Sequence, residues 1–181
     1  MVAPVKPKKV QAFGKDSYWL VPTIANIAQP KITEINAVAG MNLSCSLSRD
    51  YEGVSDDVNK ITLPGALCET EDFEANGTKK WTAADIIGFL DPQGTAAGDD
   101  KKAFEFLRAG FTGYLVRRQG KPADVANPDV TVGEFVDVFP ISVAPATTTR
   151  SGSGEDGVYQ FKAAASVSAK PAINVATVAG A

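Results

Sequence analysis

The fold of this chain is decided by FTGYLVRR (Phe111–Arg118), a connection rich in Gly, Pro, Asn and Asp (119–133), and EFVDVFPISV (Glu134–Val143). Both quoted stretches have the composition of β-strands. The second is apolar on both faces: one face carries Phe135, Phe139, Ile141 and Val143 with Asp137 among them, and the other carries Val136 and Val138. Such a strand is usually covered on both faces. We expect the core on one face, and a flanking helix or a neighbouring subunit on the other.

Length and composition limit the possible functions. The 181 residues, 44% of them hydrophobic, suffice for one globular domain of ordinary size. The net charge is −3 and histidine is absent. A basic nucleic-acid surface, histidine-dependent catalysis and the common zinc sites are therefore not expected.

The expected setting is a cytoplasm, without membrane insertion. No apolar run approaches the ~20 residues that span a membrane, and no secretory signal follows the charged N-terminus. Cys45 and Cys68, which are the two cysteines of the sequence, are accordingly predicted to be reduced and buried.

The first half of the chain predicts an arm, two strands and a hairpin. Residues 1–16 are expected to form a flexible N-terminal arm, and residues 17–181 a single β domain. Ser17–Thr23 is predicted as the first strand. Met41–Ser48 is predicted as a half-buried strand, because apolar and polar residues alternate along it. A long hairpin or loop is expected around 49–80, with a turn at Asn76-Gly77.

The second half contains the clearest helix. Asp99–Ala109 has an aspartate at its start and Gly110 where a helix C-terminus favours glycine. Lys79–Leu90 fits either a strand or the start of a helix, and Tyr159–Ala169 alternates as one further strand. The fold class is therefore mainly β, a two-sheet antiparallel β-sandwich or barrel with one flanking α-helix.

The charged residues do not form a recognisable active site. The acids between Glu69 and Glu74 lack the spacing of a calcium-binding loop. Arg117 and Arg118 are adjacent in a strand and therefore point to opposite faces. Asp137 is predicted to be a paired structural carboxylate. No catalytic residue, metal site or cofactor is predicted, so the chain is expected not to be an enzyme.

The order of these features resembles a known family. AGFTGYLVRR (109–118), followed after a polar gap by VDVFPI (136–141), is similar to the major tail proteins of long-tailed bacteriophages, most like the non-contractile type. Further similarity lies in residues 30–47, at Trp81-Thr82, and in residues 159–178.

The resemblance implies a structural function. Family members are tail tube subunits, whose hexameric rings stack into a hollow tube that the genome passes through on ejection. The resemblance implies a virion protein assembled in the host cytoplasm. Its expected partners are further copies of itself, other tail proteins at the tube ends, and double-stranded DNA in transit only, not tightly bound.

Two sets of residues are assigned to this function. The expected subunit contacts are Arg117, Arg118, Phe135, Val136, Val138 and Phe139. Asn42, Ser44 and Ser46 are expected to face the lumen, because an uncharged polar wall does not retain DNA. The alternative function is a β-sandwich carbohydrate-binding or adhesion module that uses exposed aromatic rings, with Tyr51, Trp81 and Tyr114 as candidates.

Overall fold

The computed structural model describes residues 9, 11–12, 14–65, 68, 70–96, 98–121, 128–152 and 155–180, the side chains of residues 99 and 100 excepted. Most of the arm predicted over residues 1–16 lies outside them. In chain order the elements are β1 (Asp16–Val21), α1 (Ile32–Ile35), β2 (Met41–Asn42), β3 (Val54–Leu63), β4 (Phe73–Ala83), β5 (Ile86–Phe89), α2 (Asp99–Leu107), β6 (Phe111–Gln119), β7 (Phe135–Val143), β8 (Thr147–Ser151), β9 (Val158–Ala163), β10 (Ala165–Val167) and β11 (Ala172–Ala176).

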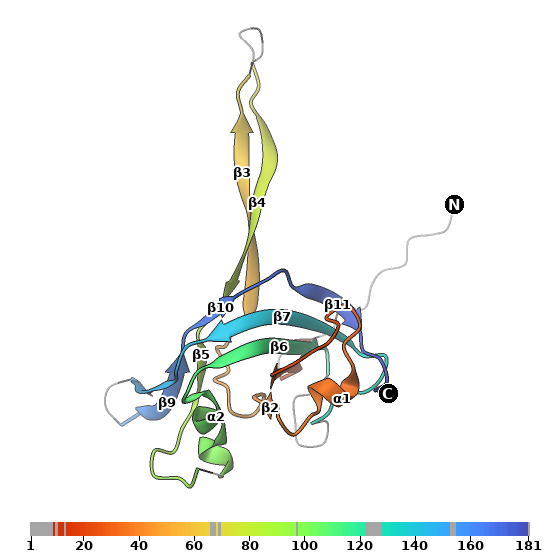
Figure 1. Cartoon of the computed structure of the whole chain (residues 1–181). Coiled ribbons are helices and arrows are strands. Elements are labelled where there is room, and N and C mark those ends of the chain that lie inside the picture. Colours follow the sequence, from red (N-terminus) through yellow and green to blue (C-terminus); the bar gives the residue numbers. More distant parts are fainter. Residues whose placement is uncertain are drawn as a thin grey trace.

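Three antiparallel sheets are formed by these strands (Figure 1). The largest has the order β10-β7-β6-β1-β2, with β11 also paired to β7, and the second has the order β5-β9-β8. The third is the hairpin β3–β4, which projects away from the other two. The predicted mainly β, antiparallel sandwich with a flanking helix is confirmed. The second helix, α1, spans only four residues.

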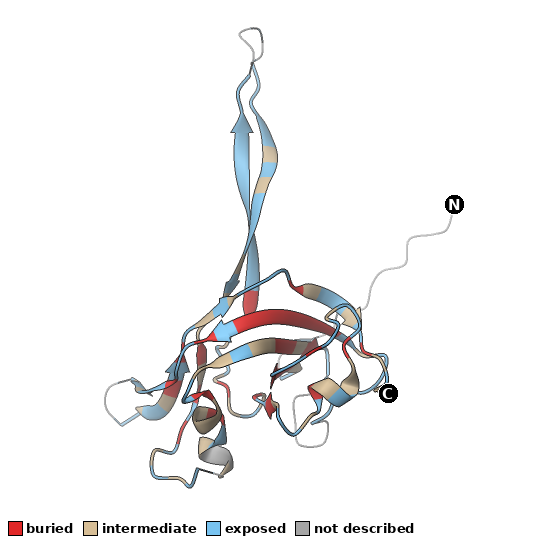
Figure 2. Cartoon of the chain, viewed as in Figure 1, coloured by how far each residue is buried: buried red, intermediate tan, exposed pale blue. Residues whose placement is uncertain are grey.

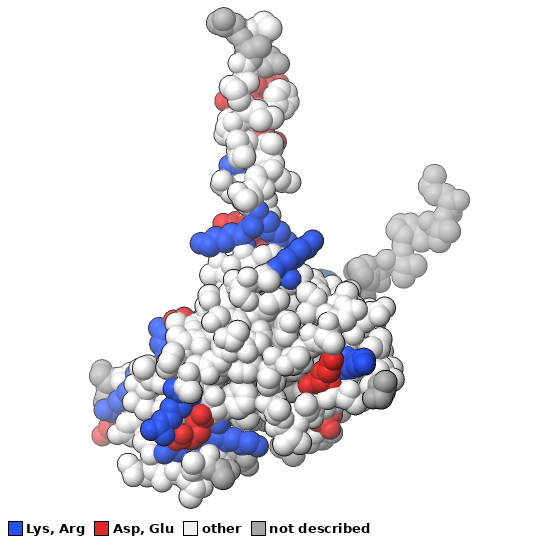
Figure 3. Space-filling model, viewed as in Figure 1, with Lys and Arg blue, Asp and Glu red and all other residues white. Residues whose placement is uncertain are grey.

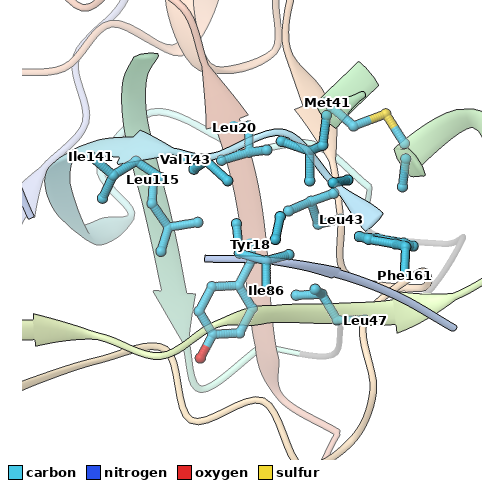
Figure 4. Close-up of a cluster of buried hydrophobic side chains, with 14 of the residues drawn as sticks. Tyr18, Leu20, Met41, Leu43, Leu47, Ile86, Leu115, Ile141, Val143 and Phe161 are labelled. Carbon is cyan, nitrogen blue, oxygen red and sulfur yellow. The ribbon is translucent and has the colours of Figure 1, made fainter. Parts of the chain in front are cut away.

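The predicted strand pair lies at the centre of the large sheet. β6 and β7 pair with Leu115 opposite Phe139 and Val116 opposite Val138. Two hydrophobic clusters cover the sheet, one on each face. The first holds Leu115, Phe139, Ile141 and Val143 with residues of the second sheet and of α2 (Figure 4). Both faces of β7 are therefore covered within the chain.

The second cluster covers the face of β7 that carries Val136 and Val138, whose cover the sequence did not determine. It holds Val116, Val136 and Val138 from the sheet, together with Ile24, Ile35 and Val130 from the segments that pack on it. Ile35 belongs to α1, and Val130 precedes β7 in the connection from β6. The long helix α2 instead packs on the opposite face, where Ala103 and Leu107 join the first cluster.

Pro140 lies in a central strand, where proline is unusual because it cannot donate a ladder hydrogen bond. Along this edge of β7, β11 pairs with residues 135–138 and β10 pairs with residues 141–143. Pro140 thus falls where one partner strand gives way to the other, and its carbonyl accepts from the Ser168 N–H at 2.9 Å. Neither partner strand therefore needs a hydrogen bond from the backbone nitrogen of residue 140, and a proline is tolerated there.

Two predicted strands differ in the structure. Met41–Ser48 is a strand only over Met41–Asn42, after which the chain makes a helical turn in which Leu47 N–H donates to Leu43 O at 3.0 Å. The Asn42 side chain starts this turn by accepting from Ser44 N–H at 3.0 Å. Leu43 and Leu47 reach the core by helical spacing, and Cys45 is exposed rather than buried. Cys68 is exposed as well.

The predicted strand Tyr159–Ala169 is divided between two sheets. β9 ends at Ala163 in the second sheet, and β10 begins at Ala165 in the large one. Apolar residues alternate without interruption through both strands, so the sequence pattern does not reveal that the chain crosses from one sheet to the other at Ala164. Farther up the chain, Lys79–Leu90 proves to be strand rather than helix, since it contains the end of β4 and all of β5.

The helix α2 spans Asp99–Leu107 with Arg108 as its C-cap, so it ends two residues before the predicted Ala109. Gly110 has φ 82° and donates its N–H to Leu107 O at 2.9 Å, the left-handed conformation that ends many helices. The N-cap is Gly98 instead of Asp99 or Asp100. The helix thus starts one residue earlier than the aspartates indicated.

Candidate assembly surface

The hairpin β3–β4 has almost no cover from its own chain. Along the ten residues of β3, Val54 is buried and the other nine are exposed. Figure 2 shows this exposure over the projecting part of the ribbon, in contrast to the buried strands of the body. An isolated two-stranded hairpin is at best marginally stable in water. Its regular pairing over such a length therefore points to a surface that another molecule covers.

The base of the hairpin is fixed to the body by one face. Val54 lies in the core, and Trp81 packs edge-on against Phe139 at 6.2 Å between ring centroids. Lys79 lies 4.4 Å above the Trp81 ring and pairs with Asp56 at 2.7 Å. Because Asp56 accepts this hydrogen bond from Lys79, its pKa is lowered. The base is therefore an anchored element with a defined direction.

The outer half of the hairpin, which we call the distal hairpin (residues 60–63 and 73–76), has one apolar and one polar face. Ile61 lies opposite Ala75, and Leu63 lies opposite Phe73. Paired residues share a face of the ribbon, so these four apolar side chains form one patch. The alternate pairs, Lys60–Asn76 and Thr62–Glu74, form the other face, where Lys60 and Glu74 make a salt bridge of 3.0 Å.

A β-bulge produces this arrangement. The register shifts between Val58 and Lys60, so that Gly77 and Thr78 together face Asn59. With an unbroken register Ile61 would face Asn76, and Leu63 would face Glu74. A Cβ at Gly77 would lie 2.9 Å from the Asn59 carbonyl oxygen, which explains the glycine. The predicted turn at Asn76-Gly77 is thus wrong: the pair lies inside β4, and the hairpin turns between residues 63 and 73.

The apolar residues predicted at subunit contacts lie mostly inside the chain. Val136, Val138 and Phe139 are only 2%, 0% and 0% exposed, because the two clusters described above enclose them. The surplus of apolar surface that suggested an interface is therefore used by the chain's own core. Phe135 differs, with 58% of its surface exposed, and it remains a candidate contact.

The two predicted arginines do point to opposite faces of the sheet. Arg117 donates from Nε and Nη2 to Asp137 Oδ2 at 3.0 and 2.8 Å and lies over the Phe139 ring. Asp137 Oδ1 accepts the Asn174 N–H at 2.8 Å, which ties β11 to the sheet. The prediction of a paired structural carboxylate at Asp137 is therefore confirmed.

Arg118 is 2% exposed and holds the connection between β6 and β7. Its guanidinium donates to Asp129 O at 2.8 Å, Ser17 Oγ at 3.2 Å and Glu134 Oε2 at 3.3 Å, and stacks over Trp19. Burial raises the pKa of Glu134, but hydrogen bonds from Lys121, Thr131 and Arg118 outweigh it and lower the pKa to about 2. Glu134 is thus charged at neutral pH, and both arginines serve the fold.

The residues predicted to face a lumen do not form one continuous strand face. Asn42 donates to Pro128 O at 3.0 Å, and Ser44 Oγ accepts the Tyr18 N–H at 3.0 Å. Ser46 is half-buried in the turn that follows. Their position in an assembly remains a prediction, although the strand that suggested it is absent.

The aromatic rings proposed for carbohydrate binding do not make a shared platform. Tyr51 packs edge-on against Tyr18 at 5.0 Å, and burial raises the pKa of its hydroxyl. Trp81 packs on Phe139, as described above, and Tyr114 is half-buried on the opposite face of the sheet, against the second cluster. Their packing gives each ring a structural role.

Chemistry-bearing groups are likewise not assembled in the part of the chain that the structure describes. There, no three Cys, Asp or Glu side chains come together as metal ligands do. No helix in the same residues is long and apolar enough to cross a membrane. The distal hairpin is thus the surface feature that most needs an explanation.

Comparison with known proteins assigns the chain to a family. The family model described as phage tail tube protein matches residues 3–180, which is almost the whole sequence. The chain belongs to the phage tail tube protein family. A search of curated proteins gave no match. This tail tube protein is therefore a structural component of a phage tail, and its exposed hairpin belongs to a chain that assembles with other tail proteins.

Sequence reasoning missed the apolar face of the distal hairpin. Ile61 and Leu63 alternate along β3, and Phe73 and Ala75 alternate along β4, so the signal was present. The pairing of the two sets depends on the bulge at Gly77-Thr78. The sequence does not reveal this bulge, because the Asn-Gly dipeptide there is a typical signal of a hairpin turn. The candidate assembly surface was thereby divided between two apparently unrelated segments.

Proposed function

We propose that the chain is the repeating subunit of a tail tube, in which closed rings, hexameric by the expectation above, stack around a lumen. The lumen would carry the phage genome during ejection. The observation that carries this proposal is the hairpin β3–β4, a long, regularly paired ribbon that has a fixed base and lacks a cover of its own.

Stacking gives the hairpin its cover. A ribbon that leaves one end of a subunit and contacts a different surface on the next subunit makes a head-to-tail contact, which repeats without limit unless it closes. Ring closure would likewise cover the edges of the large sheet. That sheet ends at β2 on one side and at β10 and β11 on the other, and pairing with neighbours removes exposed edges, which otherwise favour aggregation.

The charge balance suits a lumen through which DNA slides. Duplex DNA carries roughly one negative charge per 1.7 Å, so a basic wall would retain it. The net charge of the chain is −3, and Asn42, Ser44 and Ser46 remain our candidates for the wall. Phe135 is our candidate for a contact within a ring. The assembled tube would join other tail proteins at its ends, and assembly would take place in the host cytoplasm.

Electron microscopy of the purified protein tests the proposal. The full chain is expected to form tubes of stacked rings, whose end views give the ring number. A variant in which residues 58–79 are replaced by a two-residue Asn-Gly turn, which joins the paired residues Asp57 and Lys80, is expected to keep its fold and to lose the tubes. A full chain that stays monomeric at every protein and salt concentration would refute the proposal.

A further inference from the structure

We propose that the apolar face of the distal hairpin docks into one particular hollow of a second copy. This hollow, which we call the β5–β9 hollow, has a volume of about 340 Å³ and is lined by Cys45, Ser46, Phe89, Leu90, Asp91, Val158 and Tyr159. A hairpin docked there would cover Ser46, which leaves Asn42 and Ser44 as the candidates for the lumen wall. The inference rests on the proposed stacking of subunits and names the surface that receives the hairpin.

The two surfaces match in chemistry. On the distal hairpin, Ile61, Leu63 and Phe73 are 49%, 46% and 56% exposed. At the hollow, Phe89, Val158 and Tyr159 are 47%, 46% and 57% exposed. Each set is a group of large apolar side chains open to water, and such groups mark contact sites more often than scattered single residues do. Docking the first set on the second removes both from water.

Their positions in the fold favour contact between copies. β4 runs from the hairpin into the body and is followed, after Ala84 and Asp85, by β5. Phe89 is the last residue of β5 and therefore lies at the end of this strand that is farther from the hairpin along the chain. Leu90 N–H donates to Tyr159 O at 3.1 Å, which places the start of β9 at the same end. Figure 1 shows α2, which follows this end of β5, on the side of the body away from the hairpin. A chain therefore offers the hairpin at one end and the hollow toward the other.

Charged residues near the two surfaces would favour one orientation of the hairpin in the hollow. The connection at the end of the hairpin carries Glu71 and Asp72, both exposed. Beside the hollow, Lys101 Nζ donates to Pro92 O at 3.4 Å, and the neighbouring Lys102 is exposed. Figure 3 shows Lys and Arg side chains intermixed with Asp and Glu side chains at this end of the body. Lys101 also pairs with Glu105 at 3.7 Å, so the exposed Lys102 is the positive charge there that an acidic hairpin end would meet.

The size of the distal hairpin limits the interface area that the docking of one hairpin can bury. The four residues 60–63, at ~3.3 Å each, make the distal hairpin about 13 Å long. A ribbon ~10 Å wide then presents on the order of 130 Å² on one face, against the ~800 Å² per partner of a typical stable interface. One hairpin is therefore insufficient for a stable dimer, and simultaneous docking by all members of a ring is what makes the contact hold.

The native cysteines allow a direct test. Cys45 lines the hollow, and Cys68 lies in the connection at the end of the hairpin; both are exposed. In assembled wild-type tubes, a bismaleimide with a spacer of about 10 Å should link Cys68 of one copy to Cys45 of the next. Each chain would carry one link at each end, so denaturing gels should show a ladder of covalent oligomers. Cys45→Ser and Cys68→Ser should each abolish every cross-linked band, the dimer included, because every link needs one Cys68 and one Cys45.

Several outcomes would overturn the inference, and they differ from failure of the proposed function. Wild-type protein that forms no tubes refutes the stacking itself. Tubes that give no ladder, or a cross-linked dimer that persists in Cys45→Ser tubes, place the hairpin elsewhere. A second pair of variants gives a test without thiols. Tyr159→Asp should prevent tubes, whereas Val38→Asp, at a fully exposed apolar residue outside the hollow, should not. Tubes from Tyr159→Asp, or loss of tubes in both, would also contradict the inference.

Discussion

Strand β7 and the distal hairpin both carry an apolar face, yet only β7 is covered within the chain. Its residues 136–141 are all buried, whereas nine of the ten residues of β3 are exposed. β7 is apolar on both faces, and two clusters of the same chain enclose it. The distal hairpin is apolar on one face and finds no such cluster. An apolar pattern alone therefore does not distinguish a core from a contact between subunits.

Placing a charge in β7 should have the largest effect on stability. Phe139 is 0% exposed and contacts Trp81 and Arg117. Phe139→Glu buries a carboxylate without a dedicated partner, which should cost more than about 5 kcal/mol and prevent folding. Circular dichroism and urea unfolding measure this. Phe139→Leu, the matched control, should cost less than about 1.5 kcal/mol. A folded Phe139→Glu protein would show that β7 is not core.

The buried arginine should come next. Arg118→Met removes the buried one of the donors to Glu134 and takes the Arg118 hydrogen bonds from Ser17 Oγ and Asp129 O, so we expect a loss of about 3–5 kcal/mol in the free energy of unfolding. Arg117→Met should lose less, because the Arg117 side chain is 18% exposed rather than 2% and Asp137 keeps its bond from Asn174. Urea unfolding of the two variants gives the order, and the reverse order would contradict it.

The Glu134 network predicts a pH dependence of stability. The pKa of Glu134 in the folded state is about 2, below its ordinary value of 4.5. The folded state therefore holds the charged form more strongly, so this stabilisation is complete above pH 4.5 and is lost as the pH falls toward 2. Glu134→Gln should destabilise the protein at pH 7 by about 2 kcal/mol, with the difference from wild type vanishing near pH 2. A difference that stays constant over this range would refute the mechanism.

Changes in the distal hairpin should affect the unfolding free energy least. The combined change of Ile61, Leu63 and Phe73 to Thr alters exposed side chains only, so the free energy of unfolding should change by less than about 0.5 kcal/mol. Tube formation, measured by electron microscopy and sedimentation, should nevertheless be lost. The control changes the polar face, with Lys60→Thr and Glu74→Thr, and should keep the tubes, since an exposed salt bridge contributes little. Tubes from the apolar-face variant would remove the hairpin from the assembly surface.

The sequence predicted the central features of the fold because they are local or strongly periodic. β6 and β7 follow from their composition, and α2 follows from its flanking signals, including Gly110. The paired carboxylate at Asp137 followed from a polar residue on an apolar face. These elements needed no knowledge of distant segments.

Other features depend on contacts that a periodic pattern does not contain. Met41–Ser48 alternates like a strand, but the Asn42 side chain starts a turn that uses the same leucines at helical spacing. The cover over Val136 and Val138 comes from α1 and Val130, which are distant or weakly patterned in sequence. The candidate assembly surface was missed because one bulge sets the register of two separate strands.

The length of the hairpin also has a mechanical consequence. Both strands run from the body to the hairpin turn, so a pull along the ribbon, applied through docked hairpins, is carried by the two covalent backbones together, while the perpendicular hydrogen bonds keep them aligned. Sideways bending meets only the small cross-section of a two-stranded ribbon at each joint. A tube joined in the proposed way would resist stretching and still curve, much as a cable does.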